Sequence, residues 1–589
     1  MTPSSSAVEI LEARIAPATF TVMNPNDTGG GSLRDALALA DADPATHDTI
    51  RFHLPVPPAH SENTIVLASE LTSLGNVTIK GPGAGNLIID GAFAIRIFHI
   101  DNGDTTTDAP ASISGLSIVN GYQGTFGGGG IFSAESLTLR NVTISGCYAK
   151  NGTGGVGGGL QVDARAAGSF VKISHCMIND NFAQVAGGGL DLRAVKSIAV
   201  TSSLLANNAA TNGGGGIFAT LQSDAASAAS ITISGDTVIG NYGLIGGGIY
   251  ATTGLAPASA KLTISSSKIT GNNGTLGGGV FINGGTSIVT GSTIHDNSAK
   301  LEGGGIYADG PVSFTLSGSK VTGNRTTHAI SSSDSNYSGG GVMISGVGAN
   351  GTAKISGSQI TENSAHGSGG GIHVEGGMSL LVTACTISGN NSADGGISPR
   401  DGGAGICADG TGANKVSLTI TGSTISENQE LDGSGFGGGI QVLGDSSLTM
   451  TASKVTGNQG HHGGGLDIDT TGAVKLTGDT ITNNLAPGSL GFGGGVYLNN
   501  LTNASGFLIT GGRIAGNSAQ YGGGIFVENS PGTISSVITG NIATNIGGGV
   551  YQKGTGNVAI RAASVSGNTA PYDVSFPDNA NFAGTFTFV

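Results

Sequence analysis

Histidines and aspartates gather within residues 457–472, which read GNQGHHGGGLDIDTTG. His461 and His462 are followed by Asp467 and Asp469, and imidazole and carboxylate groups this close are those of acid–base catalysis or metal binding. Two adjacent histidines in a turn do not easily face one ion, which disfavours zinc. The two aspartates alternate with apolar residues, so both carboxylates should project from one face of a strand and could bind Ca²⁺.

These residues belong to an acidic, glycine-rich chain. It has 589 residues, 108 of them glycine, and a formal net charge of −14. That charge disfavours nucleic acid and anionic lipid as partners, because both require clustered Lys and Arg. With 38% hydrophobic residues the chain can still bury a core. No stretch is long and apolar enough for a transmembrane helix, and the first residues lack the apolar core of a conventional secretory signal.

Glycine recurs in a repeat. One signature is an aliphatic residue three positions before an asparagine, as in Ile269 and Asn272; the other is a glycine triplet before an aliphatic residue, as in Gly246–Ile249. The two alternate from about residue 112 to 568 at intervals of 24 to 39 residues, which is typical of a solenoid. Residues 262–265 and similar segments alternate apolar and polar residues, the period of a strand. The sequence therefore predicts an all-β fold, a single parallel β-helix of about 16 turns and ~75–80 Å.

Two positions of the repeat, each of which forms a column of equivalent residues in successive turns, have structural explanations. Stacked asparagines can satisfy the backbone groups of neighbouring turns. The position five residues before each asparagine is mostly serine, and Cys176 and Cys385 also occupy it. We therefore interpret both cysteines as small interior residues rather than a redox pair.

The segment before the repeats predicts a cap over the open end of the solenoid. Residues 19–22 and 49–53 read as strands, and Ser32 followed by Asp35 predicts the start of a short helix. Such a cover protects a solenoid against edge-to-edge aggregation. The chain divides into a targeting-like or disordered segment (1–18), the cap (19–56), the β-helix (57–568) and closing strands (569–589).

The paired repeats, GG[AG] before Ile, Leu or Val and aliphatic-x-x-Asn, resemble those of chlamydial polymorphic outer membrane proteins. More broadly, they are similar to right-handed parallel β-helix proteins of the pectate-lyase-like superfamily. The cap resembles a strand–GSLR–helix–strand element of bacterial surface β-helix proteins. Residues 11–14, LEAR, are similar to an LEPR-type segment of large planctomycete surface proteins. The resemblance implies a right-handed β-helix exported to the cell envelope or beyond it.

After each glycine triplet the side chains alternate inward and outward, so the first outward residue of every turn forms a column along the rod. Exposed rings suit sugar rings, and the expected ligand-binding residues of this column are Phe218, Tyr250, Phe281, Tyr307, Tyr497, Phe526 and Tyr551. Between them lies a polar window whose carboxylates could protonate a glycosidic oxygen and activate water. Its candidate catalytic residues are His373, Glu375, Asp409, Asp467 and Asp469. On this interpretation Asp467 and Asp469 pair with the first three rather than with His461 and His462.

Besides a passive stalk within a larger assembly, two functions remain open. The first is an exported bacterial surface β-helix protein with a structural or adhesive role, which could bind a polysaccharide or another cell-surface ligand. The second is a polysaccharide lyase or glycoside hydrolase acting on a polymer laid along the β-helix, as in similar β-helix enzymes. Neither requires a resident cofactor, although Ca²⁺ could bind at the aspartates. Long insertions at one corner, expected beside the polar window, fall within 325–338, 391–401, 429–436 and 485–492.

Overall fold

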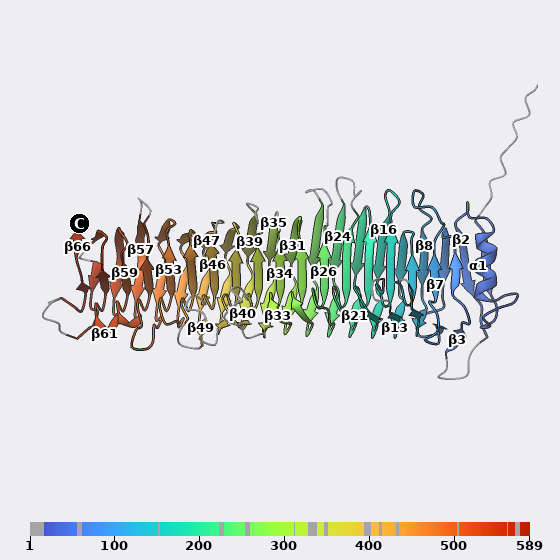
Figure 1. Ribbon diagram of the computed structural model, residues 1–589, viewed down its shortest axis with the longest axis horizontal. Coiled ribbons are helices and arrows are strands. Elements are labelled where there is room, and N and C mark those ends of the chain that lie inside the picture. Colours follow the sequence, from blue (N-terminus) through green and yellow to red (C-terminus); the bar gives the residue numbers. More distant parts are fainter. Residues whose placement is uncertain are drawn as a thin grey trace, which may run out of the picture.

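The computed structural model shows one straight rod of stacked strands with a helix at one end (Figure 1). It confirms the predicted all-β solenoid, with about 17 turns. The structure describes residues 17–55, 62–125, 127–150, 154–222, 229–253, 260–310, 313–327, 339–346, 351–393, 402–410, 415–431, 435–502, 506–561, 564–571 and 578–589. The segment 1–16, with the LEAR motif, lies outside these residues, as does much of the first three long insertions.

One turn shows how the repeat folds. It runs through β27 (Lys261–Ser265), β28 (Lys268–Thr270), β29 (Asn273–Leu276) and β30 (Val280–Asn283). Positive-φ residues separate these strands: Ser266 at the first bend, Gly271 at the second and Gly277 at the third. Each strand pairs in parallel with the corresponding strand of the next turn, so the backbone groups of one turn are satisfied by its neighbours.

One continuous parallel sheet, called here the triplet sheet, consists mostly of the strands that follow the glycine triplets. Parallel pairing stacks each strand on the one from the next turn. Its strands after β4 (Leu71–Ser73) are β7 (Phe98–Ile100), β11 (Ile131–Ser133), β15 (Leu160–Ala164), β19 (Leu190–Ala194), β23 (Ile217–Leu221), β26 (Ile249–Thr252), β30, β34 (Ile306–Asp309), β38 (Val342–Ser345), β42 (Ile372–Glu375), β46 (Ile406–Gly410), β50 (Ile440–Gly444), β53 (Leu466–Thr470), β56 (Val496–Asn499), β59 (Ile525–Glu528), β62 (Val550–Lys553) and β65 (Phe582–Ala583).

Steric crowding explains why the triplet consists of glycines. Gly277, the first glycine of its triplet, has a φ of +61°, in the left-handed region that favours glycine. A Cβ atom at the second glycine, Gly278, would collide with the carbonyl oxygens of Ser298 and Gly304 in the next turn. A side chain at this corner would therefore push neighbouring turns apart.

The core is a single stripe of aliphatic side chains inside the rod. Ile264, Ile269 and Ile282 of one turn are fully buried, and the same positions are buried in successive turns. Cys176 and Cys385 are buried and free, as predicted for small interior residues. At the end of the chain, β66 (Phe586–Phe588) pairs with β63 (Val558–Ile560).

The cap folds as predicted. β1 (Thr19–Val22) pairs with β2 (Asp48–Phe52), which continues into the sheets of the solenoid. Between them, α1 (Leu33–Asp41) is N-capped by Ser32, whose hydroxyl accepts from the Asp35 amide at 3.2 Å. Leu33 and Leu37 bury the inner face of α1 at the end of the rod. In the part of the chain that the structure describes, no helix has the length and apolar character needed to cross a membrane.

Candidate functional sites on the triplet sheet

The predicted outer column exists in the predicted register. Phe218 lies opposite Tyr250, Tyr250 opposite Phe281, and Phe281 opposite Tyr307 in consecutive turns. The rings of Phe218, Tyr250 and Phe281 stack with centroids 4.8 and 5.1 Å apart and interplanar angles of 10° and 14°. Tyr497, which begins the second aromatic run, lies opposite Phe526 in the same way.

The sequence predicts that all seven aromatic side chains proposed to bind ligand are exposed. This prediction is wrong for four of them. Phe281 is 5% exposed and Phe526 is fully buried, and Tyr307 and Tyr497 are also buried. Phe218, Tyr250 and Tyr551 are partly exposed. The first aromatic run consists of Phe218, Tyr250, Phe281 and Tyr307. Burial favours a packing role for its members Phe281 and Tyr307, and ligand binding by the seven aromatic residues stays a prediction.

A second row of side chains covers the column, and sequence reasoning missed it. It consists of the residue before each glycine triplet, here called the covering row. Ile245 and Leu276 of this row pack on Tyr250, Phe281, Tyr307 and Met343 as a small external core. Further along, the row is aromatic at Phe436, His462, Phe492 and Tyr521, all partly exposed. The signal was present in the sequence, since each of these residues directly precedes a triplet.

His373 and Glu375 form a largely buried ion pair. His373 Nε2 lies 3.7 Å from Glu375 Oε2, and Glu375 Oε1 accepts from the Ser345 hydroxyl at 3.0 Å. Burial acts to lower the pKa of His373, but Cys407 and Glu375 together raise it well above its usual range. Burial likewise acts to raise the pKa of Glu375, yet His373 brings it below its ordinary value. The contact between the two side chains therefore favours the charged form of each.

The five candidate catalytic residues share one sheet but do not form one centre. His373 lies opposite Cys407, Cys407 opposite Gln441, and Gln441 opposite Asp467. Three turns at ~4.8 Å each separate His373 from Asp467 by about 14 Å. Asp409 is next to Glu375 on the neighbouring strand. Paired carboxyl groups of glycosidases lie within about 10 Å, so His373 and Asp467 cannot act on one bond.

Asp467 and Asp469 instead line a pocket with His462, contrary to the expectation that their partners lie on the turns of His373 and Asp409. This C-terminal pocket has a volume of about 200 Å³. The His462 ring packs 4.5 Å from the Phe436 ring and 5.2 Å from the Tyr497 ring, measured between centroids. The residues lining the C-terminal pocket are Phe436, Gln441, Leu443, His462, Asp467, Asp469, Tyr497 and Asn499.

Burial sets the charges in the C-terminal pocket. It raises the pKa of Asp467 well above its usual value, and the nearby Asp469 charge acts in the same direction. It lowers the pKa of His462 to about 3, with His461 adding to the shift. Asp469 accepts a hydrogen bond from the Asn500 side chain at 2.7 Å. Burial therefore favours the protonated form of Asp467 and the neutral form of the His462 ring.

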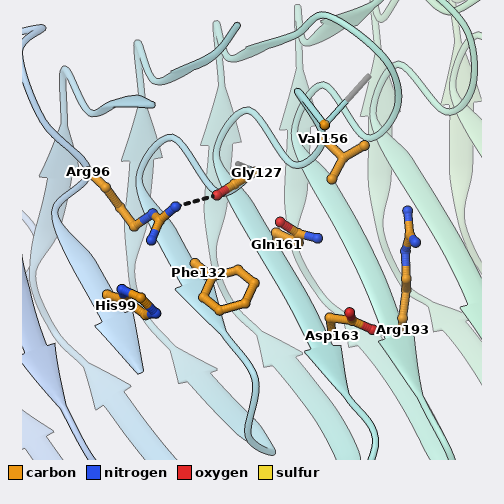
Figure 2. Close-up of a pocket in the computed structure, with 9 residues that line it drawn as sticks. Arg96, His99, Gly127, Phe132, Val156, Gln161, Asp163 and Arg193 are labelled. Carbon is orange, nitrogen blue, oxygen red and sulfur yellow. Dashed lines mark hydrogen bonds between the residues drawn. The ribbon is translucent and has the colours of Figure 1, made fainter. Parts of the chain in front are cut away.

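A larger pocket lies near the other end of the triplet sheet (Figure 2). Its volume is about 400 Å³. The outer column reaches it through His99, Phe132 and Gln161, which lie opposite one another in β7, β11 and β15. The residues lining this N-terminal pocket are Arg96, His99, Gly127, Phe132, Gly154, Val156, Gln161, Asp163 and Arg193. The sequence interpretation began the column at Gln161 and so missed Phe132 and His99 in the two preceding turns.

Arg96 is fixed in the wall of the N-terminal pocket. Its guanidinium donates to the carbonyl oxygens of Gly127 and Gly128 at 3.0 and 3.1 Å and lies 3.5 Å from Glu70. It also stands over the Phe132 ring, 5.2 Å from its centroid (Figure 2). At the opposite wall, Arg193 binds the fully buried Asp191 through two hydrogen bonds of 2.8 and 3.0 Å.

No metal centre is evident in the described part of the chain, where no three His, Cys, Asp or Glu side chains are placed to hold an ion. His461 and His462 stack with centroids 4.9 Å apart rather than converging on one point. Calcium binding at Asp467 and Asp469 stays a prediction.

One comparison with known proteins bears on the fold. A family described as right handed beta helix region matches residues 304–481 and 400–570. The match spans less than half of the chain and agrees with the parallel strand register, and the fold is that of a right-handed parallel β-helix. No curated protein matches the sequence. Among solved structures it is similar to PfbA, a surface adhesin of Streptococcus pneumoniae, with 10% identity over 92% of this chain and 93% of that chain. The TM-score is 0.18, so this similarity carries no functional argument.

Proposed function

We propose that the protein is an exported bacterial surface β-helix that binds carbohydrate on the outer face of the triplet sheet, with an adhesive or structural role and without cleaving its ligand. The single observation that carries the binding proposal is the C-terminal pocket. It combines partly exposed rings of Phe436 and His462 with the polar side chains of Gln441, Asp469 and Asn499. Rings that offer apolar faces, next to a few groups that form hydrogen bonds, are what a sugar requires.

The binding proposal is tested by affinity electrophoresis of the whole protein in gels that contain neutral or acidic polysaccharides. We expect retardation in at least one gel and a clear loss of retardation in Phe436→Leu, which removes a ring but keeps an apolar side chain. The control is Phe93→Leu, because Phe93 is an exposed ring outside the triplet sheet. Equal mobility with and without every polysaccharide would contradict the proposal.

Envelope location is supported by the resemblance of the cap and repeats to bacterial surface proteins. The test is fractionation of cells that produce the full chain from its native gene. Recovery in the envelope or the medium is the expected outcome. A protein found only in the cytoplasm would overturn this part of the proposal.

A glycoside hydrolase is the second candidate, favoured by one observation. Asp467 and Asp469 line the same pocket, and burial favours the protonated form of Asp467, which is the form a general acid requires. Asp469, on the same face of the strand, would be the second carboxylate. Incubation with the same polysaccharides, followed by assay for new reducing ends or unsaturated products, distinguishes the two candidates. Turnover that is abolished in both Asp467→Asn and Asp469→Asn would establish cleavage in place of simple binding.

A further inference from the structure

The N-terminal pocket is separate from the C-terminal pocket and has its own chemistry. Phe132 lies on β11 and Asp467 on β53, with ten strands of the triplet sheet between them. We propose that the N-terminal pocket is a second, independent binding site, and that it takes a neutral sugar ring rather than an acidic one. This inference rests on the proposed carbohydrate-binding function and adds a site and a ligand class to it.

Phe132 gives the pocket an apolar floor. Its ring is partly exposed, and the His99 ring meets it edge-on at 5.2 Å between centroids. Val156 lies across the pocket from Phe132, and the polar ends of Gln161 and Asp163 lie beside the floor (Figure 2). At about 400 Å³ the space is within the usual range of ~300–1,000 Å³ for small-molecule pockets. A flat floor with polar walls suits a ring that has an apolar face and hydroxyl groups at its rim.

The side-chain amide of Gln161 lacks a polar partner for its oxygen among the described residues. The side chain is 8% exposed, and its Oε1 has no hydrogen-bond partner among the described residues. Leaving a buried amide group unsatisfied costs about 1–3 kcal/mol in proteins, so a ligand hydroxyl that this amide met by turning into the pocket would relieve a cost already present in the fold. Glycine at position 127 leaves room for this amide oxygen. A Cβ atom at that position would collide with Gln161 Oε1 and with the Val156 carbonyl oxygen.

The charges around the pocket exclude an acidic sugar. Each guanidinium already faces a carboxylate: Arg96 faces Glu70, Arg193 binds Asp191, and Arg165 binds Asp163. The His99 ring nitrogens lie 3.5 Å from Glu70 and 4.0 Å from Asp101, so this ring too faces acids. A carboxylate brought into the pocket would lose its hydration, find no unpaired cation among the lining residues and meet Asp163. A neutral ring avoids this penalty and can still accept from Arg193 and donate to Asp163.

The test is saturation-transfer NMR on the full chain with matched pairs of methyl glycosides. The neutral probes are methyl β-glucoside and methyl β-galactoside, and the acidic probes are the corresponding uronides, in which a carboxylate replaces the hydroxymethyl group. We expect the neutral probes to bind at least about tenfold more tightly than the uronides, a difference equivalent to ~1.4 kcal/mol. Phe132→Leu and Gln161→Leu should each weaken the neutral probes about tenfold by the same relation. Phe93→Leu, at an exposed ring outside the triplet sheet, should leave them unchanged.

Each contrary outcome has a distinct meaning. Uronides that bind as tightly as neutral glycosides overturn the ligand class. Neutral glycosides that bind but respond only to Phe436→Leu overturn the site, while the proposed carbohydrate binding stands. The site is likewise overturned if no methyl glycoside binds but polysaccharide gels still retard the protein. If neither assay detects binding, the proposed function fails as well. Thermal unfolding of each variant, compared with the wild type, shows that a loss of binding is not a loss of fold.

Discussion

The side-chain amide of Asn363 donates a hydrogen bond to Oδ1 of Asn390, one turn further along the rod, at 3.0 Å. The same Oδ1 accepts from the Asn363 backbone amide at 3.0 Å, and the Asn363 side chain also donates to the Val321 carbonyl at 2.9 Å. This arrangement repeats from Asn181 to Asn568, and every asparagine of this ladder is buried. The ladder satisfies the backbone at the turn before the glycine triplet, and so holds the triplet sheet in register.

Replacing one member of the ladder should destabilise the rod. Asn363→Ala leaves the Val321 carbonyl and the Asn324 amide, which donates to Asn363 Oδ1 at 3.0 Å, without their partners. We expect a loss of about 3 kcal/mol in the free energy of unfolding. Because turns of a solenoid depend mainly on their neighbours, hydrogen exchange should rise most around Asn363. Asn273→Ala, at an exposed position next to the ladder, is the control and should change stability by less than about 0.5 kcal/mol. Equal effects of the two substitutions would contradict this role of the ladder.

Stability should fall as the pH rises from 5 to 8. Asp236 and Asp479 occupy the interior column that is otherwise mostly serine. Burial raises their pKa values from the ordinary 3.8 to about 7 and about 6. A carboxyl whose pKa is raised by folding contributes stability that is complete below the unfolded pKa and is lost as pH rises through the folded pKa. Asp236→Ser should remove part of this dependence, on the order of 2 kcal/mol between pH 5 and 8.

The measurement is denaturant unfolding at both pH values. Asp104→Asn serves as the control, because hydrogen bonds from Thr106 lower the pKa of this carboxyl and place its titration outside the window. A stability curve that rises from pH 5 to pH 8, or an Asp236→Ser variant with the wild-type pH dependence, would show that burial of Asp236 does not act as described.

Phe281, in the first aromatic run, should stabilise the fold rather than bind a ligand. Phe281 stacks on Tyr250 and is covered by the external core around Leu276. Phe281→Ala should cost about 3 kcal/mol of stability, as usual for a buried aromatic residue. Retardation in polysaccharide gels should stay at the wild-type level under folding conditions. Lost retardation in a variant that still unfolds cooperatively would return Phe281 to the set of ligand-binding residues.

The thiols of Cys147 and Cys176 should be inert in the native protein. All four cysteines are buried, and burial raises the pKa of Cys147 to about 12 and that of Cys176 to about 11. Thiolates are the reactive form, so a thiol reagent at pH 8 should label neither Cys147 nor Cys176 before denaturation and both of them afterwards. Rapid labelling of the native chain at any one position would show that this position opens to solvent.

The repeat made the fold predictable, because the same kind of residue recurs at the equivalent position of many turns. The columns of Asn272 and Ile269, the order of strands and the outward position of Tyr250 all follow from the period and the alternation of the sequence. The helix cap at Ser32 could be predicted equally well, because capping depends on residues close together in the sequence. The right-handed β-helix is confirmed.

The sites were predicted less well, because burial depends on what covers a surface. Outward-facing Phe281 was expected to be exposed, and the covering row buries it with Leu276. His462 was assigned to a turn, yet it packs beside Tyr497 and lines the pocket of Asp467. Pockets also arise where side chains are small, and the N-terminal pocket depends on Gly127, which looks like any other glycine of the repeat. Such sites depend on the neighbours of a column in three dimensions, which alternation along one strand does not reveal.

The most direct test of carbohydrate binding on the triplet sheet is isothermal titration of the full chain with a polysaccharide that retards it in gels. Wild type, Phe132→Leu, Phe436→Leu and the double variant would be compared under conditions in which all four melt within about 3 °C of one another. We predict saturable binding by the wild type, weaker binding by each single variant and no measurable heat for the double variant. Wild-type affinity in the double variant would place the ligand elsewhere on the molecule and contradict binding on this sheet.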